Sequence, residues 1–344
     1  MEENKNKSDR AADGRAADGR RAEVFTSRVD LSALHESITS IKNSIGKWVV
    51  GQERMIELII TAILADGHVL LEGVPGVAKT LTAKLVARII SVDFSRIQFT
   101  PDLMPSDVLG TSVFNEKLTD FEFRKGPVFA NIVLVDEINR APAKTQASLF
   151  EVMEERQITI DGKTHKMQPP FMVLATQNPI EQEGTYRLPE AQLDRFLFKI
   201  EVNYPSLDEE TLMLQEFHKR KNTVDITTVT PVISAEQLSD YRQKVRDIHI
   251  DDKLIRYITT IVNDTRSAKT LFLGASPRAS LGILSGAKAY AAIQGRDFVT
   301  PEDIKNVAQP ALIHRVILTP EAEMEGQQPA DVLTRLIDKI EVPR

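Results

Sequence analysis

Residues 73–80 read GVPGVAKT; they follow the apolar run 69–71 and precede a stretch of good helix formers. Strand, glycine-rich turn and helix, in this order, form the context that a phosphate-binding loop requires. The start of such a helix presents unpaired N–H groups and the positive end of its dipole to an anion. We predict that Lys79 contacts the β- and γ-phosphates of a nucleotide and that the Thr80 hydroxyl binds Mg²⁺. The expected binding residues of the loop are Gly73, Val74, Pro75, Gly76, Val77, Ala78, Lys79, Thr80 and Leu81.

One position departs from the pattern G-x-x-x-x-G-K-[ST], because residue 78 is Ala. Alanine is small, and we expect it to cost little if the backbone there is helical. The alternative is an ordinary strand-to-helix turn with a capping lysine. A cation in the first turn of a helix opposes its dipole, so that alternative leaves Lys79 unexplained.

The run NIVLV at 131–135 is typical of a strand buried on both faces of a parallel sheet, and it ends at Asp136 and Glu137. We predict that Asp136 holds Mg²⁺ through its water shell and that Glu137 orients and deprotonates the attacking water. Two solvated carboxylates at a strand end are the alternative. Another apolar run, 171–175, leads to Asn178, which either positions the water or contacts the γ-phosphate, or is a turn residue before proline.

Two arginines are candidates for contacts with the nucleotide. Arg278 follows Ser-Pro at 276–277, which reads as the N-cap and first residue of a helix. A cation there is unfavourable, so we expect an anion nearby, such as a nucleotide between two domains. Arg195 ends a short helix predicted for 188–195; it is either a surface residue at the helix end or a finger that reaches the γ-phosphate of an adjacent subunit. Further candidates for the same interface are Arg140 and Arg187.

The elements that position these residues alternate between strand and helix as far as residue 204, which predicts a parallel sheet with its ligand at the carboxyl ends of the strands. Two hairpins are expected, at about 113–123 and 157–167. Beyond Pro205 strand patterns are absent and helical periods fill the chain. We therefore divide it into a disordered tail (1–28), an α/β core (29–204) and a helical domain (205–344); the tail carries the immediate repeat AADGR.

Composition narrows the classes of function. A chain of 344 residues is long enough for about two domains. The net charge of −6 argues against nucleic acid as the main partner. The absence of cysteine excludes disulfides and thiol catalysis and suits a reducing cytoplasm. No apolar run reaches the roughly 20 residues that span a bilayer, and the six histidines lack metal-ligand spacing.

Together these motifs resemble the MoxR family of AAA+ ATPases, over about residues 31 to 341. GVPGVAKT resembles its Walker A loop, in which alanine often replaces the second glycine, and NIVLVDEINRAP resembles its Walker B segment. ATQNP is similar to sensor 1, LPEAQLDRF to the arginine-finger helix and GASPRA to sensor 2. The stretch VVGQ at 49–52 matches the segment near the adenine, so the resemblance adds Val50 and Gly51 to the expected binding residues.

The resemblance implies a P-loop AAA+ α/β core followed by a smaller, all-helical lid domain. It implies ATP hydrolysis with Mg²⁺ in ring oligomers, usually hexamers. Asn178 and Arg278 would sense the γ-phosphate in cis, and Arg195 would act in trans. Family members remodel or activate protein complexes, often with von Willebrand factor A domain partners; no such domain is in this chain.

Three alternatives remain open at this point. Related ring ATPases with the same hairpins include helicases, so a nucleic-acid motor is one; steep salt dependence of DNA-stimulated hydrolysis would favour it. The motor subunit of a metal chelatase would have much the same fold. A nucleotide-gated scaffold that hardly turns over would be recognised by a phosphate-release assay.

Overall fold

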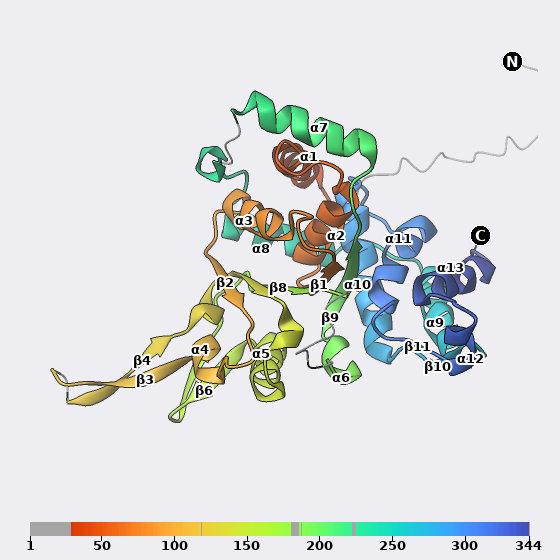
Figure 1. Ribbon diagram of the computed structural model, residues 1–344. Helices are drawn as coiled ribbons and strands as arrows, with labels where there is room; N and C mark the ends of the chain where they lie inside the picture. Colours follow the sequence, from red (N-terminus) through yellow and green to blue (C-terminus); the bar gives the residue numbers. More distant parts are fainter. Residues whose placement is uncertain (1–28, 118, 180–185, 187, 222–224, 344) are drawn as a thin grey trace, which may run out of the picture.

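The computed structural model describes residues 29–117, 119–179, 186, 188–221 and 225–343, and its centre is a five-stranded sheet (Figure 1). The strand order is β2-β5-β8-β1-β9 and all four pairings are parallel, as the alternation of strand and helix predicted. All five strands therefore end at the same edge of the sheet. Their bounds are β1 (His68–Gly73), β2 (Phe94–Gln98), β5 (Ile132–Asp136), β8 (Met172–Gln177) and β9 (Phe196–Val202).

The two faces of the sheet belong to two hydrophobic clusters. Along β5, Ile132 and Leu134 pack in the cluster of α1, α2 and α3, whereas Val133 and Val135 pack in the cluster of α5. This alternation follows from the twofold period of a strand. Both faces are covered by helices, which explains the continuous apolar runs. The helices are α1 (Ser32–Gly46), α2 (Glu53–Leu64), α3 (Lys79–Ile89), α4 (Pro105–Leu109) and α5 (Ala143–Glu155).

Two hairpins interrupt the α/β alternation, and both were predicted. The turn of the second has positive φ at Asp161 (51°) and Gly162 (73°), the conformation that Asp-Gly favours between antiparallel strands. The first hairpin extends away from the body of the molecule (Figure 1). The strands are β3 (Gly110–Asn115) with β4 (Asp120–Lys125), and β6 (Gln157–Ile160) with β7 (Lys163–Lys166).

The part of the chain after β9 is mainly helical, as expected, but it also contains a two-stranded antiparallel ribbon. Its strands are too short to display an alternating pattern, so the sequence did not reveal them. Among the described residues, every helix is too short or too polar to cross a bilayer. The elements are α6 (Glu190–Leu193, before β9), α7 (Leu207–Lys219), α8 (Ala235–Arg246), α9 (Asp252–Ser267), β10 (Leu271–Leu273), α10 (Pro277–Ile293), α11 (Pro301–Leu312), β11 (Ile317–Leu318), α12 (Pro320–Met324) and α13 (Pro329–Lys339).

The first helices after β9 return to the face of the sheet that α1 and α3 cover (Figure 1). The Arg220 guanidinium after α7 lies 4.6 Å from the centre of the Trp48 ring, and the Tyr241 hydroxyl of α8 lies 2.9 Å from that of Ser37. One hydrophobic cluster contains side chains from both sides of residue 205. The domain division at 204/205 stays a prediction, and the expected tail 1–28 lies outside the described residues.

Candidate functional site at the carboxyl-terminal edge of the sheet

The glycine-rich turn joins the end of β1 to the start of α3. Gly73 has to be glycine because a Cβ there would lie 2.4 Å from the Val202 carbonyl oxygen of the neighbouring strand. Gly76 meets no such obstacle but has φ of 88°, which disfavours any other residue. The first glycine thus allows close packing of β1 on β9, and the second allows the turn itself.

Ala78 does not meet the condition under which alanine was expected to cost little. That condition was a helical backbone at this position, but the φ and ψ of Ala78 are 59° and 18°. This left-handed conformation brings Cβ close to the following carbonyl and costs an L-residue about 1–2 kcal/mol. Alanine replaces glycine here at a real energetic cost, although α3 begins at the next residue.

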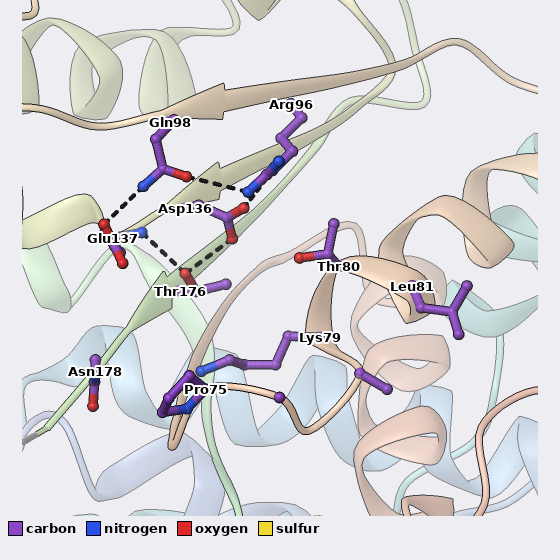
Figure 2. Close-up of a pocket in the computed structure, with 12 residues that line it drawn as sticks. Pro75, Lys79, Thr80, Leu81, Arg96, Gln98, Asp136, Glu137, Thr176 and Asn178 are labelled. Atoms are coloured by element: carbon purple, nitrogen blue, oxygen red, sulfur yellow. Dashed lines mark hydrogen bonds and ion pairs between the residues drawn. The ribbon is translucent and has the colours of Figure 1, made fainter.

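A cavity of about 430 Å³ opens between the turn and the ends of β5 and β8 (Figure 2). The Lys79 ammonium donates a hydrogen bond of 2.6 Å to the Gly73 carbonyl, and the Thr80 hydroxyl points into the cavity. Burial lowers the pKa of Lys79, while Asp136 and Glu137 oppose this shift. The cavity is lined by Pro75, Gly76, Ala78, Lys79, Thr80, Leu81, Arg96, Gln98, Asp136, Glu137, Thr176 and Asn178.

Asp136 and Glu137 lie at the end of β5, as predicted, and neighbouring strands hold both. Asp136 is 6% exposed; Arg96 contacts one carboxylate oxygen at 2.6 Å and the Thr176 hydroxyl donates to the other at 3.2 Å. The Glu137 carboxylate accepts a hydrogen bond of 2.7 Å from the Gln98 side-chain amide. Glu137 has a φ of 56°, and non-glycine residues in this conformation are concentrated at functional sites.

Three residues that the sequence reading missed hold this pair of carboxylates. Thr176 also accepts a hydrogen bond of 3.0 Å from the Glu137 backbone N–H, so one hydroxyl fixes both acids. Arg96 and Gln98 are two residues apart on β2 and turn to the same side of the strand. Their spacing was visible in the sequence, but the adjacency of β2 and β5 was not.

The donors at this edge fit Mg²⁺. This ion usually takes one or two oxygen ligands from the protein and completes its shell with phosphate and water. The Thr80 hydroxyl and the Asp136 carboxylate supply oxygens, and the guanidinium on Asp136 shows that a positive charge is accommodated there. Thr80 and Asp136 would hold Mg²⁺, whose charge would offset that of the phosphates.

The remaining expected binding residues are divided. Asn178 lines the cavity, just beyond the end of β8. Val50, Gly51, Val74 and Val77 do not line it; Val77 is buried, and the side chain of Glu209 lies beside Gly51. Their roles in nucleotide binding stay predictions.

Arg195 and Arg278 lie at the opposite edge of the sheet. Arg195 directly precedes β9, whose first residue pairs with His68, the first residue of β1. Arg278 and Arg195 contact the same carboxylate, that of Glu154 in α5. They line a second cavity, of about 280 Å³, which shares no lining residue with the first within the described residues.

A cis role for Arg278 would need its side chain at the cavity beside Lys79, whereas the structure places it at the opposite edge of the sheet; the role itself stays a prediction. The six residues of β1 separate the two edges, and at about 3.3 Å per residue that is roughly 20 Å. The anion expected beside Arg278 is the Glu154 carboxylate, at 2.6 Å, rather than a nucleotide of the same subunit. Of the other candidate arginines, Arg140 forms an ion pair of 3.2 Å with Glu137, and Arg187 lies outside the described residues.

A partly buried network fixes the amino-terminal edge of the sheet, where Arg195 and Arg278 lie (the arginine edge). The Asp194 carboxylate accepts a hydrogen bond of 2.9 Å from the hydroxyl of Ser276, the residue that caps α10. It accepts another, of 2.6 Å, from Nε of Arg315, which follows α11. Arg315 also donates to the carbonyls of Asp194 and Phe196, at 2.9 and 2.8 Å. Three elements that are distant in sequence therefore meet next to Arg195.

Comparison with known proteins identifies both parts of the chain. Residues 68–198 match the family model described as "ATPase family associated with various cellular activities (AAA)", and 263–336 match an AAA lid domain. The chain is 42% identical to Chaperone MoxR1 of Mycobacterium tuberculosis, over 92% of this chain and 84% of that protein. It is 46% identical to the uncharacterized protein YeaC of Bacillus subtilis, over 90% and 96%.

The fold has a similar solved counterpart. The crystal structure of a candidate ATPase from Cytophaga hutchinsonii superposes with a TM-score of 0.83 at 42% identity, covering 91% of this chain and 97% of that one. The similarity in sequence and in fold thus extends over nearly the whole length of the chain. The chain belongs to the MoxR family of AAA+ ATPases, and its reaction is the hydrolysis of ATP.

Proposed function

We propose that this ATPase works as a head-to-tail ring, requires Mg²⁺ and remodels a protein client in the cytoplasm. The observation that carries the proposal is that the candidate residues lie at two opposite edges of the sheet. Lys79, Thr80, Asp136, Glu137 and Asn178 lie at one edge, and Arg195 and Arg278 lie at the other. Arginines that cannot reach the triphosphate of their own subunit can complete a site in a second copy.

Head-to-tail contact between copies is heterologous, so the same contact repeats until a ring closes or a filament grows. A hexamer is the ring size that we propose from the family resemblance. Within each site, Lys79 contacts the phosphates, Thr80 and Asp136 hold Mg²⁺, and Glu137 activates water. Arg195 and Arg278 of the next subunit stabilise the charge that develops on the γ-phosphate.

A relative and the first hairpin support a protein client. Chaperone MoxR1, a relative at 42% identity, is a chaperone by name, which supports work on other proteins. The hairpin β3–β4 extends from the body and exposes Val113, Phe114 and Phe121, so it offers apolar contacts for such a client (Figure 1). A separate von Willebrand factor A domain protein is the partner that we propose from the resemblance.

Two substitutions at the carboxyl-terminal edge of the sheet, which carries the glycine-rich turn and the β5 carboxylates (the phosphate edge), test the proposed chemistry. Glu137→Gln removes the base but keeps the side-chain shape, so ATP binding is retained while turnover falls by about 10²- to 10⁴-fold. Lys79→Ala removes the cation that contacts the phosphates, so binding itself is lost. Binding is measured with a fluorescent ATP analogue and turnover by phosphate release, each with and without Mg²⁺. Turnover of Glu137→Gln at the wild-type rate would refute the role of Glu137.

A further inference from the structure

Two charged side chains at the arginine edge stand at unfavourable ends of their helices. Arg278 is in the first turn of α10, where the helix dipole disfavours a cation. Glu154 is in the last turn of α5, where the dipole disfavours an anion. The Arg278 guanidinium meets the Glu154 carboxylate at 2.6 Å, so each offsets the other. Each charge is unfavourable at the end of its own helix, and the ion pair between them accounts for both positions.

Glu154 binds Arg195 as well. Its second carboxylate oxygen lies 3.3 Å from the Arg195 Nε, and the Arg195 guanidinium lies 6.0 Å from the centre of the Phe150 ring, one turn earlier on α5. One face of α5 therefore sets the position of Arg195, and one carboxylate holds both guanidiniums side by side. Two cations at such short range would otherwise repel each other.

The three side chains remain open to solvent, unlike the frame around them. Arg195, Arg278 and Glu154 are 30%, 43% and 36% exposed, whereas Arg315 is 3% exposed. The bonds of Arg315 and Ser276 to Asp194 already join β9, α10 and α11. Glu154 thus adds little to the joining of these elements, and what it determines is where the two exposed guanidiniums stand.

We infer that Glu154 is a positioning residue, which holds Arg195 and Arg278 as one pair ready for the triphosphate bound by a second copy of this chain. The inference rests on the proposed action of these arginines across subunits. The carboxylate does not touch the nucleotide; it sets the spacing of the two groups that do. Misplacement of a catalytic group by about 1 Å can cost as much as 10²-fold in rate.

Glu154→Gln tests this inference, with Glu155→Gln as the matched control. Both remove one carboxylate from the end of α5, but only Glu154 contacts the arginines among the described residues. We expect kcat of Glu154→Gln to fall roughly 10- to 100-fold, with unchanged ATP affinity, because its own phosphate loop is intact. Glu155→Gln keeps wild-type turnover. Glu154→Ala, which lacks even the amide oxygen, should fall further.

Mixing subunits separates positioning from a fold defect. In a mixture with Lys79→Ala, a Glu154→Gln phosphate loop can lie next to an intact arginine pair, so turnover should exceed that of either variant alone. Arg195→Ala mixed with Lys79→Ala is the reference. Wild-type turnover of Glu154→Gln, or loss of its ATP affinity, would refute the role of Glu154. So would recovery of turnover in the reference mixture without recovery in the mixture that contains Glu154→Gln. No recovery in the reference mixture refutes action across subunits, and the role of Glu154 with it.

Discussion

The two edges of the five-stranded sheet are built in different ways. At the carboxyl-terminal edge, the reactive groups follow directly from strand ends, within short runs such as 73–80 and 136–137. At the amino-terminal edge, one carboxylate of α5 holds both arginines, while Asp194 beside them is bonded to Ser276 at the start of α10 and to Arg315 after α11. The first edge is a property of local backbone, and the second exists only after distant elements have packed.

The largest expected effect tests whether both arginines act across subunits. Arg195→Ala should lower turnover by about 10³-fold or more, as for an arginine finger, and Arg278→Ala by about 10²- to 10³-fold, as for one transition-state donor. Mixing either variant with Lys79→Ala should restore activity, measured by phosphate release. If Arg278 acts in cis instead, its mixture stays inactive while that of Arg195 recovers, and the division between the edges breaks down for Arg278.

Acid should weaken the arginine edge. Burial lowers the pKa of His68 from 6.5 to about 4 and that of His314 well below its usual value; their Nε2 atoms donate to the carbonyls of Met153 and Phe196, respectively. Both stay neutral when folded but take a proton when unfolded, so stability is lost as pH falls from 6.5 toward 4. From about pH 7.5 to about pH 5, His68 alone contributes a loss of about 2 kcal/mol.

Urea unfolding at the two pH values measures this loss. His68→Gln removes the titrating group, so its stability should depend less steeply on pH than that of the wild type. An equal pH dependence in both proteins would show that His68 is not the cause. The cavity at the phosphate edge has no histidine among its described lining residues, which confines this test to the arginine edge.

The smallest effect concerns the backbone of the phosphate edge. Ala78→Gly relieves the left-handed strain and should stabilise the fold by about 1 kcal/mol. The control is Ala147→Gly, at an exposed position inside α5, which should instead destabilise it by about 1 kcal/mol. If residue 78 is strained, thermal unfolding will show changes in stability of opposite sign for the two variants. If it is not, both variants will be destabilised.

Much of the phosphate edge could be predicted from sequence, because its residues directly follow apolar runs that are typical of buried strands. Lys79, Asp136 and Glu137 were found in this way. Thr176 was missed because its role depends on β8 lying beside β5. The order of strands in a sheet cannot be read from any single segment of the sequence. The cost of Ala78 could not be settled from sequence, because the left-handed residue and the start of the helix differ by only one position.

The arginine edge was only partly predictable. The unfavourable position of Arg278 correctly indicated an anionic partner, but sequence spacing could not tell a carboxylate of α5 from a nucleotide. The partner depends on where the fold places the start of α10 relative to the end of α5, some 120 residues earlier in the chain. Asp194 and Arg315 meet for the same reason, and neither belongs to a local pattern.

The bond from the Lys79 ammonium to the Gly73 carbonyl has a consequence for ligand binding. It uses one of the three N–H donors of the ammonium, at 2.6 Å, and leaves two for an incoming anion. The loop therefore holds its own cation in place before the anion arrives, so less side-chain freedom is lost when the anion binds.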